Sequence, residues 1–412
     1  MLPPILEIYT VWHPLDREGE QIAQDFFDHF HGTLYSGLLG GAVETYQRSV
    51  PWSSTSSAPR PIIFDNASSM FGISPAEIIV IIPILGMSLA REVEPGSGQW
   101  FGYLNEIIER HRANPKHIFV MPIAIDHSCD SDTVLGKMFS SDLRIGTSTD
   151  SRKESPALAR CRDVTQAIAQ LAGDGKRIKV FISHTKRSEY GQEDTVTELI
   201  ESVRRIIAGT RLTTFFDSQD LQVGTDWATT LVLEASHGAV IALRTDLYAS
   251  REWCQKEIRV SKNAGMPVVI LEALMGTEQR GSFLMDHVPR VAAHQVNGGW
   301  NEEQIRRALA LLVDECLKRI LWKRQEQAAI RAGTPVQVSW WAPHAPEPLT
   351  FSEWLANGGR GKVTPDNALR ILHPDPPLGR DELEVLDQLR ALAKLTVTLD
   401  VLTPRMLAVR GV

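Results

Sequence analysis

A tryptophan and a glutamate, Trp253 and Glu257, lie four residues apart in the segment YASREWCQKEI, residues 248–258. On a helix this spacing places the two side chains on one face, an indole that offers a flat apolar wall beside a carboxylate. The apolar run 239–243 before the segment is typical of a buried strand, and open α/β sheets bind ligands beyond the carboxyl ends of their strands. The segment is therefore the first candidate for a functional site. A surface glutamate beside a core tryptophan is the alternative.

The elements that would position this segment alternate between strands and helices. Strands are predicted at 177–184, 212–216, 239–243 and 266–271, and helices at 194–208, 227–236 and the candidate segment itself. Such alternation, with apolar and β-branched strands, is typical of a parallel α/β sheet. Residues 176–300 are therefore predicted to form a nearly complete five-stranded domain of this kind.

The rest of the chain is predicted to form a second α/β domain and three smaller regions. Residues 1–130 carry strand patterns at 5–12, 61–64, 77–85 and 117–125, and helix patterns at 17–30 and 99–112. A polar linker with a short helix follows at 131–175, a long amphipathic helix at 301–332 and a mixed region at 333–412. The basic residues of the long helix are expected to form a solvated face, with a partner or nucleic-acid surface as the alternative.

Three strand ends carry a similar pattern. His13-Pro14, Ser183-His184 and His373-Pro374 each follow an apolar run and precede a helix pattern. For residues 1–130 this pattern predicts a degenerate copy of the central domain. For the tail, the alternative is that any strand followed by a turn and a helix begins in this way.

The composition is that of a globular protein. The 412 residues suffice for two or three domains, and 43% of them are hydrophobic and 23% charged. A net charge of -7 argues against non-specific binding to nucleic acid. The longest apolar run, 78–85, is too short to span a bilayer, and we see no signal-peptide pattern. We therefore expect a cytoplasmic protein with no membrane partner.

The sequence offers no motif for a metal or a bound cofactor. The four cysteines are scattered, without CxxC spacing or a neighbouring histidine cluster: Cys129, Cys161, Cys254 and Cys316. No GxxxxGK[ST] loop is present and no GxGxxG follows a strand, so kinase, ATPase and dehydrogenase functions lack a motif. We expect neither a metal nor a cofactor, and we interpret Cys254 as a buried structural thiol.

Three central blocks together resemble a known family. VFISH (180–184), FFDSQDLQVGTDW (215–227) and YASREWCQKEI (248–258) resemble, in order and separation, a Toll/interleukin-1 receptor (TIR) domain. The resemblance covers under a third of the chain and implies a flavodoxin-like, parallel five-stranded fold. Trp253 and Glu257 match the WCxxE-like element of TIR domains that cleave NAD+, whereas adaptor-type TIR domains typically lack this glutamate. The resemblance therefore implies an NAD+ glycohydrolase or cyclase of bacterial type.

The same resemblance implies roles for particular residues. Glu257 would be catalytic. Four residues would bind the substrate: Phe181, Ser183, Asp217 and Trp253. A loop containing Asp220, Leu221 and Gly224 would support oligomerisation, and its movement would open or close the substrate pocket. His184 could act as a general base, but a hydrogen bond to the backbone is the better interpretation of a histidine at a strand end.

The chemistry agrees with this assignment. Nicotinamide is a cationic leaving group in NAD+, so its glycosidic bond breaks with little acid assistance, and positive charge develops on the ribose. A single carboxylate near that sugar can stabilise the charge and accept hydrogen bonds from the ribose hydroxyls. NAD+ is then the substrate rather than a cofactor.

We therefore predict a TIR-domain NAD+ hydrolase or cyclase that self-association activates in antiviral defence. A homo-oligomer or filament is expected, with a regulatory partner or ligand at the N-terminal or C-terminal region. The alternative is a non-catalytic TIR scaffold that oligomerises and signals. In residues 1–130, Trp100 and Glu106 lie six rather than four residues apart, so one active site per chain is expected.

Overall fold

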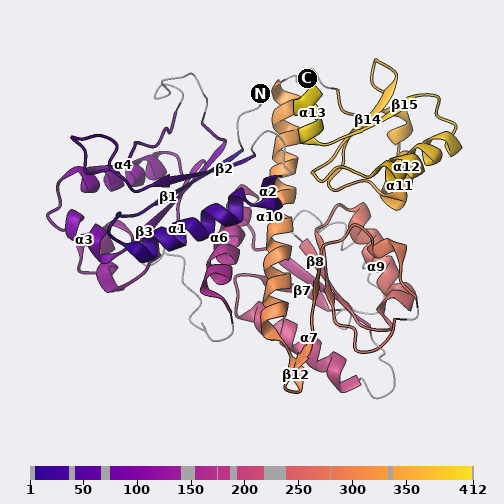
Figure 1. Ribbon diagram of the computed structural model, residues 1–412, viewed down its shortest axis with the longest axis horizontal. Helices are drawn as coiled ribbons and strands as arrows, with labels where there is room; N and C mark the ends of the chain where they lie inside the picture. Colours follow the sequence, from indigo (N-terminus) through magenta and orange to yellow (C-terminus); the bar gives the residue numbers. More distant parts are fainter. Residues whose placement is uncertain are drawn as a thin grey trace. The chain divides into compact units, whose positions relative to one another are not determined.

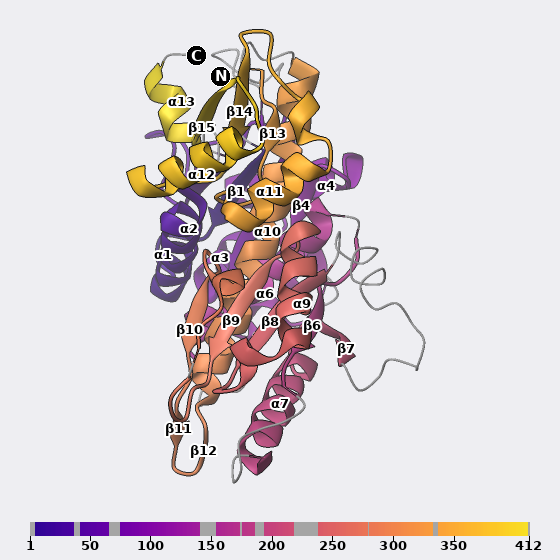
Figure 2. The same ribbon diagram turned by 90° about the vertical axis from the view of Figure 1, so that its right-hand side faces the viewer.

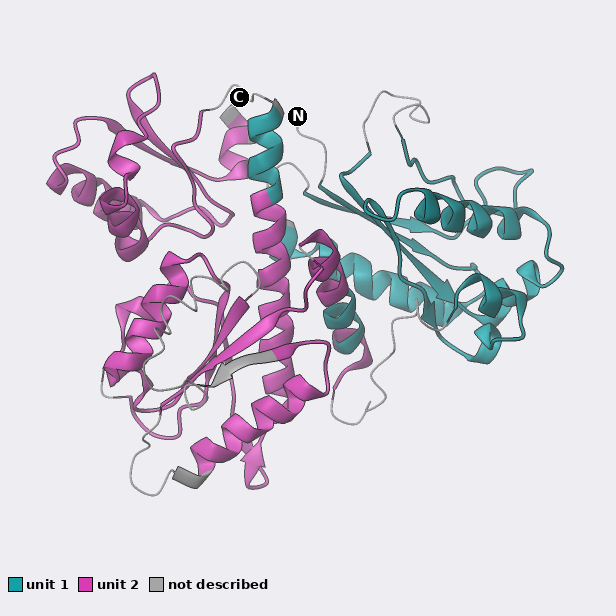
Figure 3. Ribbon diagram, turned by 180° about the vertical axis from the view of Figure 1, so that it is seen from behind, with its two compact units in different colours: residues 1–149, 159–164, 324–332 teal, residues 150–158, 165–323, 333–412 magenta. Residues whose placement is uncertain are grey.

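A computed structural model describes residues 5–36, 42–65, 75–140, 154–173, 175–185, 193–217, 238–278, 280–332 and 337–410. The chain divides into two compact units (Figure 3). The first comprises residues 1–149, 159–164 and 324–332, and the second comprises residues 150–158, 165–323 and 333–412. The predicted class, α/β with parallel sheets, is confirmed. No helix within the described ranges combines the length and apolar character needed to cross a membrane.

The first unit is built on a parallel sheet. Its strands are β1 (Leu6–Val11), β2 (Val43–Arg48), β3 (Ile78–Leu85), β4 (Ile118–Val120) and β5 (Ile123–Ala124), in the order β2-β1-β3-β4, with β5 also paired to β3. Its helices are α1 (Arg17–His31), α2 (Thr33–Ser36), α3 (Met87–Val93), α4 (Gln99–Ala113) and α5 (Val134–Met138). Strands β1 and β3 are buried along their whole length, which explains the uninterrupted apolar sequence of β3. Strand β1 also buries Glu7, which accepts a hydrogen bond from the Tyr9 hydroxyl at 3.0 Å.

The strand predicted at 61–64 does not form. Ile62 and Phe64 still pack against the core of the first unit, but their backbone joins no ladder. Pro59 and Pro61 lack the N–H donors that a paired strand needs. The edge position of the sheet is taken instead by β2, whose mixed sequence VETYQR carries too little apolar pattern to be recognised.

The second unit holds the five-stranded central sheet. Its strands are β6 (Lys179–Ser183), β7 (Thr213–Asp217), β8 (Gly238–Arg244), β9 (Val268–Glu272) and β10 (Arg290–Ala292). They lie in the order β10-β9-β8-β6-β7, visible in Figure 2, and every pair is parallel. Numbered within this sheet, the order is 2-1-3-4-5, that of an open, doubly wound sheet. The winding reverses between β6 and β8, so a crevice is expected beyond their carboxyl ends.

Helices cover both faces of the central sheet. Figure 1 shows α9 (Glu252–Asn263) on one side and α10 (Glu302–Ala332) on the other. The face under α9 has its own core, which includes Phe181, Val240 and Ile258. The second unit also contains α7 (Glu193–Ala208), most of α6 (Pro156–Ala172) and a short hairpin of β11 (Gln295–Val296) and β12 (Gly299–Trp300).

The basic residues of α10 do not form the solvated face that the sequence predicts. Of those predicted to be exposed, only Arg307 and Lys323 are. Others pair with carboxylates: Arg306 with Glu154 and Glu302, Lys318 with Glu315, and Arg324 with Glu77. The helix buries adjacent positions such as Leu312 and Val313, so other elements cover more than one of its faces.

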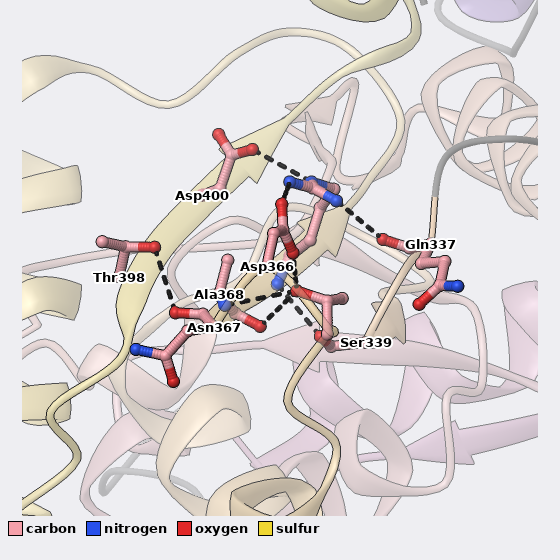
Figure 4. A network of polar contacts seen from close by, with 9 residues as sticks. Gln337, Ser339, Asp366, Asn367, Ala368, Thr398 and Asp400 are labelled. Carbon is pink, nitrogen blue, oxygen red and sulfur yellow. Dashed lines mark hydrogen bonds and ion pairs between the residues drawn. The ribbon is translucent and has the colours of Figure 1, made fainter.

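Residues 337–410 form a compact part of the second unit with a core of its own. A parallel sheet of β13 (Trp340–Trp341), β14 (Ala368–Leu372) and β15 (Thr398–Leu402) packs with α11 (Pro348–Ala356) and α12 (Arg380–Leu392), and α13 (Pro404–Arg410) follows. Arg370 of β14 binds Asp366 at 2.7 Å and Asp400 of β15 at 3.1 Å (Figure 4). It also donates to the Gln337 carbonyl, so one guanidinium joins segments on both sides of β14.

The first and central sheets share a winding order. Numbered within its own sheet, the first unit reads 2-1-3-4, the same as the first four strands of the central sheet. The first strand of each is followed by a buried histidine, His13 or His184. Unrelated proteins also share such orders, so a common origin for the two sheets stays a prediction.

Candidate functional site

Polar side chains gather beyond the carboxyl ends of β6 and β8, where the winding reverses. Thr185 follows β6 and Thr245 follows β8, and their hydroxyl oxygens lie 3.4 Å apart. Asp246 accepts hydrogen bonds from the backbone N–H groups of Met275 at 3.0 Å and Gly276 at 2.9 Å, in the loop after β9. These contacts tie together the carboxyl ends of three neighbouring strands.

Glu257 joins this polar group from α9. The helix buries one stripe of side chains, which comprises Cys254, Glu257, Ile258, Ser261 and Lys262. The apolar members of the stripe pack on the sheet. Because Glu257 lies in the same stripe, its side chain is also in the interior, with 1% exposure. A carboxylate this deeply buried needs hydrogen-bond partners.

A chain of hydroxyl groups supplies one of those partners. Ser183, the last residue of β6, donates a short hydrogen bond to Oε2 of Glu257. The Ser183 hydroxyl then accepts from the hydroxyl of Tyr248, 2.5 Å away. Burial, with smaller contributions from Cys254 and Glu257, raises the pKa of Tyr248 well above its ordinary value, so the phenol keeps the proton that it donates. The arrangement holds Glu257 as a hydrogen-bond acceptor at the winding reversal of the sheet.

Trp253 does not share the burial of Glu257. Its side chain is 43% exposed, and the Lys256 ammonium lies 5.6 Å from its ring centroid, within cation–π range. Trp253 precedes Cys254 by one residue, about 100° around the helix, which places it at the edge of the buried stripe. The four-residue spacing predicted that Trp253 and Glu257 share one face of the helix. In the structure, Glu257 is buried and Trp253 is exposed.

The other predicted substrate-binding residues have different positions. Phe181 lies two residues before Ser183 on the same side of β6, and it is 3% exposed within the core under α9. It forms part of the floor beneath Ser183. Asp217 ends β7, and its backbone pairs with that of Ile182, the neighbour of Ser183 in β6. Asp220, Leu221 and Gly224 lie outside the described residues.

His184 contacts the backbone, as its strand-end position indicates. It is 4% exposed, and its Nδ1 lies 3.0 Å from the carbonyl oxygen of Thr185. His373, at the end of β14, makes the equivalent contact with the Pro374 carbonyl at 2.8 Å. The repeated contact supports a structural role for these histidines at the ends of parallel strands.

Cys254 is a poor nucleophile. Its thiol donates to the carbonyl of His184 at 3.6 Å. Burial, and secondarily the carboxylate of Glu257, raises the pKa of this thiol to about 12. All four cysteines are buried, and none of them forms a disulfide. No group of three or more potential metal ligands occurs within the described ranges.

The thiol pKa gives a direct prediction. At pH 8 a thiol with a pKa near 12 is ionised to about 0.01%, against roughly a quarter for an unperturbed cysteine. Alkylation of Cys254 by iodoacetamide should therefore be about a thousandfold slower in the folded protein than in urea. Mass spectrometry of the peptide containing Cys254 measures both rates. Equal rates would contradict the burial of this thiol.

Tyr248 is the main residue that sequence reasoning missed. It is the first residue of the candidate segment 248–258, yet nothing in that segment marks its hydroxyl as a partner of Ser183. The contact joins positions 65 residues apart. A tyrosine just after a buried strand is the only available signal, because a buried phenol requires a hydrogen-bond partner.

Comparisons with known proteins do not assign the chain to a family. No family model matches it, and no curated protein matches it. One similar solved structure is that of a proposed phosphosugar isomerase from Silicibacter pomeroyi DSS-3. It has 10% sequence identity, and the alignment covers 80% of this chain and 88% of that chain, with a TM-score of 0.19. A score this low carries no argument about fold or function.

Proposed function

We propose that the second unit contains a TIR-type domain that cleaves the nicotinamide–ribose bond of NAD+ with Glu257 as the catalytic carboxylate. One observation carries the proposal: Glu257 lies at the winding reversal of a 2-1-3-4-5 sheet, where Ser183 holds its carboxylate. The strand order fits the fold that the blocks at 180–184, 215–227 and 248–258 imply. The site also carries the glutamate that adaptor-type TIR domains typically lack.

The proposed reaction follows from the charges. The bond between ribose C1′ and the nicotinamide nitrogen breaks, and its electron pair leaves with nicotinamide, which becomes neutral. The positive charge then rests on the ribose, where the Glu257 carboxylate stabilises it. Water adds to C1′ and loses a proton to give ADP-ribose, or an adenine nitrogen adds to give a cyclic product. Trp253 offers an exposed aromatic face beside the site for positioning the substrate.

The burial of Glu257 implies that the described conformation is closed. A side chain with 1% exposure cannot meet a dinucleotide unless neighbouring segments move. Such gating fits an enzyme that would deplete NAD+ if it were always active. We propose that self-association of the chain in antiviral defence drives the opening.

The direct test is nicotinamide release from NAD+ by the purified full chain, with and without crowding agents that promote self-association. We expect turnover under the crowded condition and little without it. Product analysis then distinguishes ADP-ribose from a cyclic nucleotide. Release at the background rate under every condition, from a folded protein, contradicts the proposal.

Ser183 provides a sharper prediction. Ser183→Ala removes the hydrogen bond to Glu257, and hydrogen bonds to charged groups contribute about 1.5–3 kcal/mol. We expect kcat for nicotinamide release to fall about ten- to a hundredfold. Ser250→Ala is the matched control, because Ser250 is exposed and, among the described residues, its hydroxyl bonds only to the Leu247 carbonyl. Wild-type turnover by Ser183→Ala would remove Ser183 from the site.

A scaffold function is the second candidate, and the same burial supports it. A glutamate that is fully enclosed and hydrogen-bonded can simply brace α9 against β6. In that case the chain would self-associate and signal without consuming NAD+. Light scattering and nicotinamide release measured on one sample separate the two functions.

A further inference from the structure

A cavity of about 320 Å³ lies in the second unit, at the opposite edge of the central sheet from Glu257. Its lining includes Lys262, near the end of α9, and Pro267 and Val268, at the amino end of β9. α10 supplies Arg319, and the segments around β13 and β14 supply His344 and Asp375. Cavities of this size commonly hold small molecules.

Most charged groups around the cavity already have partners. Lys262 binds Glu347 at 2.6 Å, Lys318 binds Glu315 at 2.7 Å, and His287 binds Glu382 at 3.0 Å. The opposite charges within each pair offset each other and leave little net attraction for a charged ligand. The groups of the lining that lack a partner therefore indicate what ligand the cavity could bind.

Arg319 is such a group. Its Nη1 atom is buried and has no hydrogen-bond partner, and the guanidinium forms no ion pair within the described ranges. Burial lowers the pKa of Arg319 to about 10, so the side chain still carries its charge at neutral pH. The charge of Glu315 partly opposes this shift, but Glu315 pairs directly with Lys318. A partly buried guanidinium without a direct ion pair is costly for the folded state, and a bound anion would offset that cost. Arginine is suited to phosphate because its N–H groups match phosphate oxygens in pairs.

Two further groups in the lining are acceptors without donors. His344 Nδ1 lies 3.1 Å from the Ala345 carbonyl and must donate to it, so the neutral ring leaves Nε2 as an acceptor. That Nε2 atom is buried without a partner. Burial, followed by the charge of Arg319, lowers the pKa of His344 to about 3, which keeps the ring neutral. Both carboxylate oxygens of Asp375 also lack hydrogen bonds, although Arg405 lies 3.5 Å from one of them.

The polar groups that lack hydrogen-bond partners together fit one class of ligand. A phosphate would satisfy Arg319, and hydroxyl groups would donate to His344 and Asp375. We propose that the cavity binds a hydroxyl-bearing phosphate ester, of the sugar-phosphate or nucleotide class, with Arg319 on the phosphate and His344 and Asp375 on the hydroxyls. Proline-rich walls, including Pro267, Pro343 and Pro376, offer rigid apolar surfaces to the ring of such a ligand.

Isothermal titration of the full chain with ribose 5-phosphate, inorganic phosphate and ribose tests the proposal. We expect saturable binding of ribose 5-phosphate, weaker binding of phosphate and none of ribose alone. Arg319→Met should weaken ribose 5-phosphate at least about tenfold. His344→Phe should weaken ribose 5-phosphate while leaving inorganic phosphate unchanged. Arg259→Met is the control, since Arg259 is an exposed arginine outside the cavity that pairs with Glu353.

A stability measurement guards against variants that merely misfold. Arg319→Met removes a charge that has no direct ion pair among the described residues, so it should raise the Tm of the ligand-free protein by about 2–4 °C while it weakens binding. No saturable binding of ribose 5-phosphate at millimolar concentration would overturn the proposal. A less stable Arg319→Met protein, or one that binds like the wild type, would overturn it as well.

Discussion

Glu257→Gln should abolish NAD+ cleavage, with a fall in kcat for nicotinamide release of at least about a thousandfold. The amide keeps the size of the side chain and can still accept the hydrogen bond of Ser183. It lacks the negative charge that the ribose cation requires. Stability should therefore change little while turnover disappears.

The matched control lies on the same helix. Glu252→Gln makes the same chemical change at an exposed position in the first turn of α9, and we expect its turnover to equal that of the wild type. Chromatography of nicotinamide from the three proteins, at equal concentration and state of assembly, measures the effect. Equal turnover by Glu257→Gln would transfer catalysis to another residue. Loss of turnover in both variants would point to a disturbed α9 rather than to a catalytic carboxylate.

Lys262→Met should cause the largest loss of stability, about 3–5 kcal/mol. Lys262 and Glu347 are both almost fully buried, and the Lys262 ammonium also donates to the Asp286 carbonyl at 2.7 Å. Burial lowers the pKa of Lys262 and raises that of Glu347, which shows how far both groups are withdrawn from water. Removing one partner leaves the other in the interior without its counter-charge.

Two comparisons separate this effect from ordinary loss of contact. The double variant Lys262→Met/Glu347→Leu should regain most of the lost stability, because no charge remains buried. Arg259→Met, which breaks an ion pair whose arginine is exposed, should cost no more than about 1 kcal/mol. Urea denaturation followed by tryptophan fluorescence measures all four proteins. A double variant as unstable as Lys262→Met would show that packing, and not charge, is responsible.

The parallel α/β class could be predicted because its cause is local. Strands buried on both faces are mostly apolar, and the runs 78–85 and 239–243 can be recognised by this pattern. The apolar pattern gives a wrong prediction where a segment is buried without pairing in a sheet, or pairs in a sheet without being fully buried. Residues 61–64 are apolar because they pack on a core, yet Pro59 and Pro61 lack the N–H donors that pairing needs, whereas β2 pairs with a half-polar sequence.

The candidate site was only partly predictable, because its contacts are long-range. The carboxylate of Glu257 and the hydroxyl of Ser183 could be assigned to one crevice from the order of strands. The hydroxyl of Tyr248, which completes the chain, depends on a contact that only the folded chain defines. The cavity beside Arg319 had no sequence signal, since its walls come from distant segments.

The pairing of Lys262 with Glu347 also determines the shortest fragment of this chain in which the central sheet can fold. Glu347 is the N-cap residue of α11, and Leu349 of that helix packs on the same core as Phe181. A fragment ending before α11 would keep every strand of the central sheet. It would, however, leave the Lys262 ammonium in the interior without the Glu347 carboxylate. The sheet and α11 therefore gain and lose their structure together, as one cooperative unit, although 75 residues separate β9 from the start of α11.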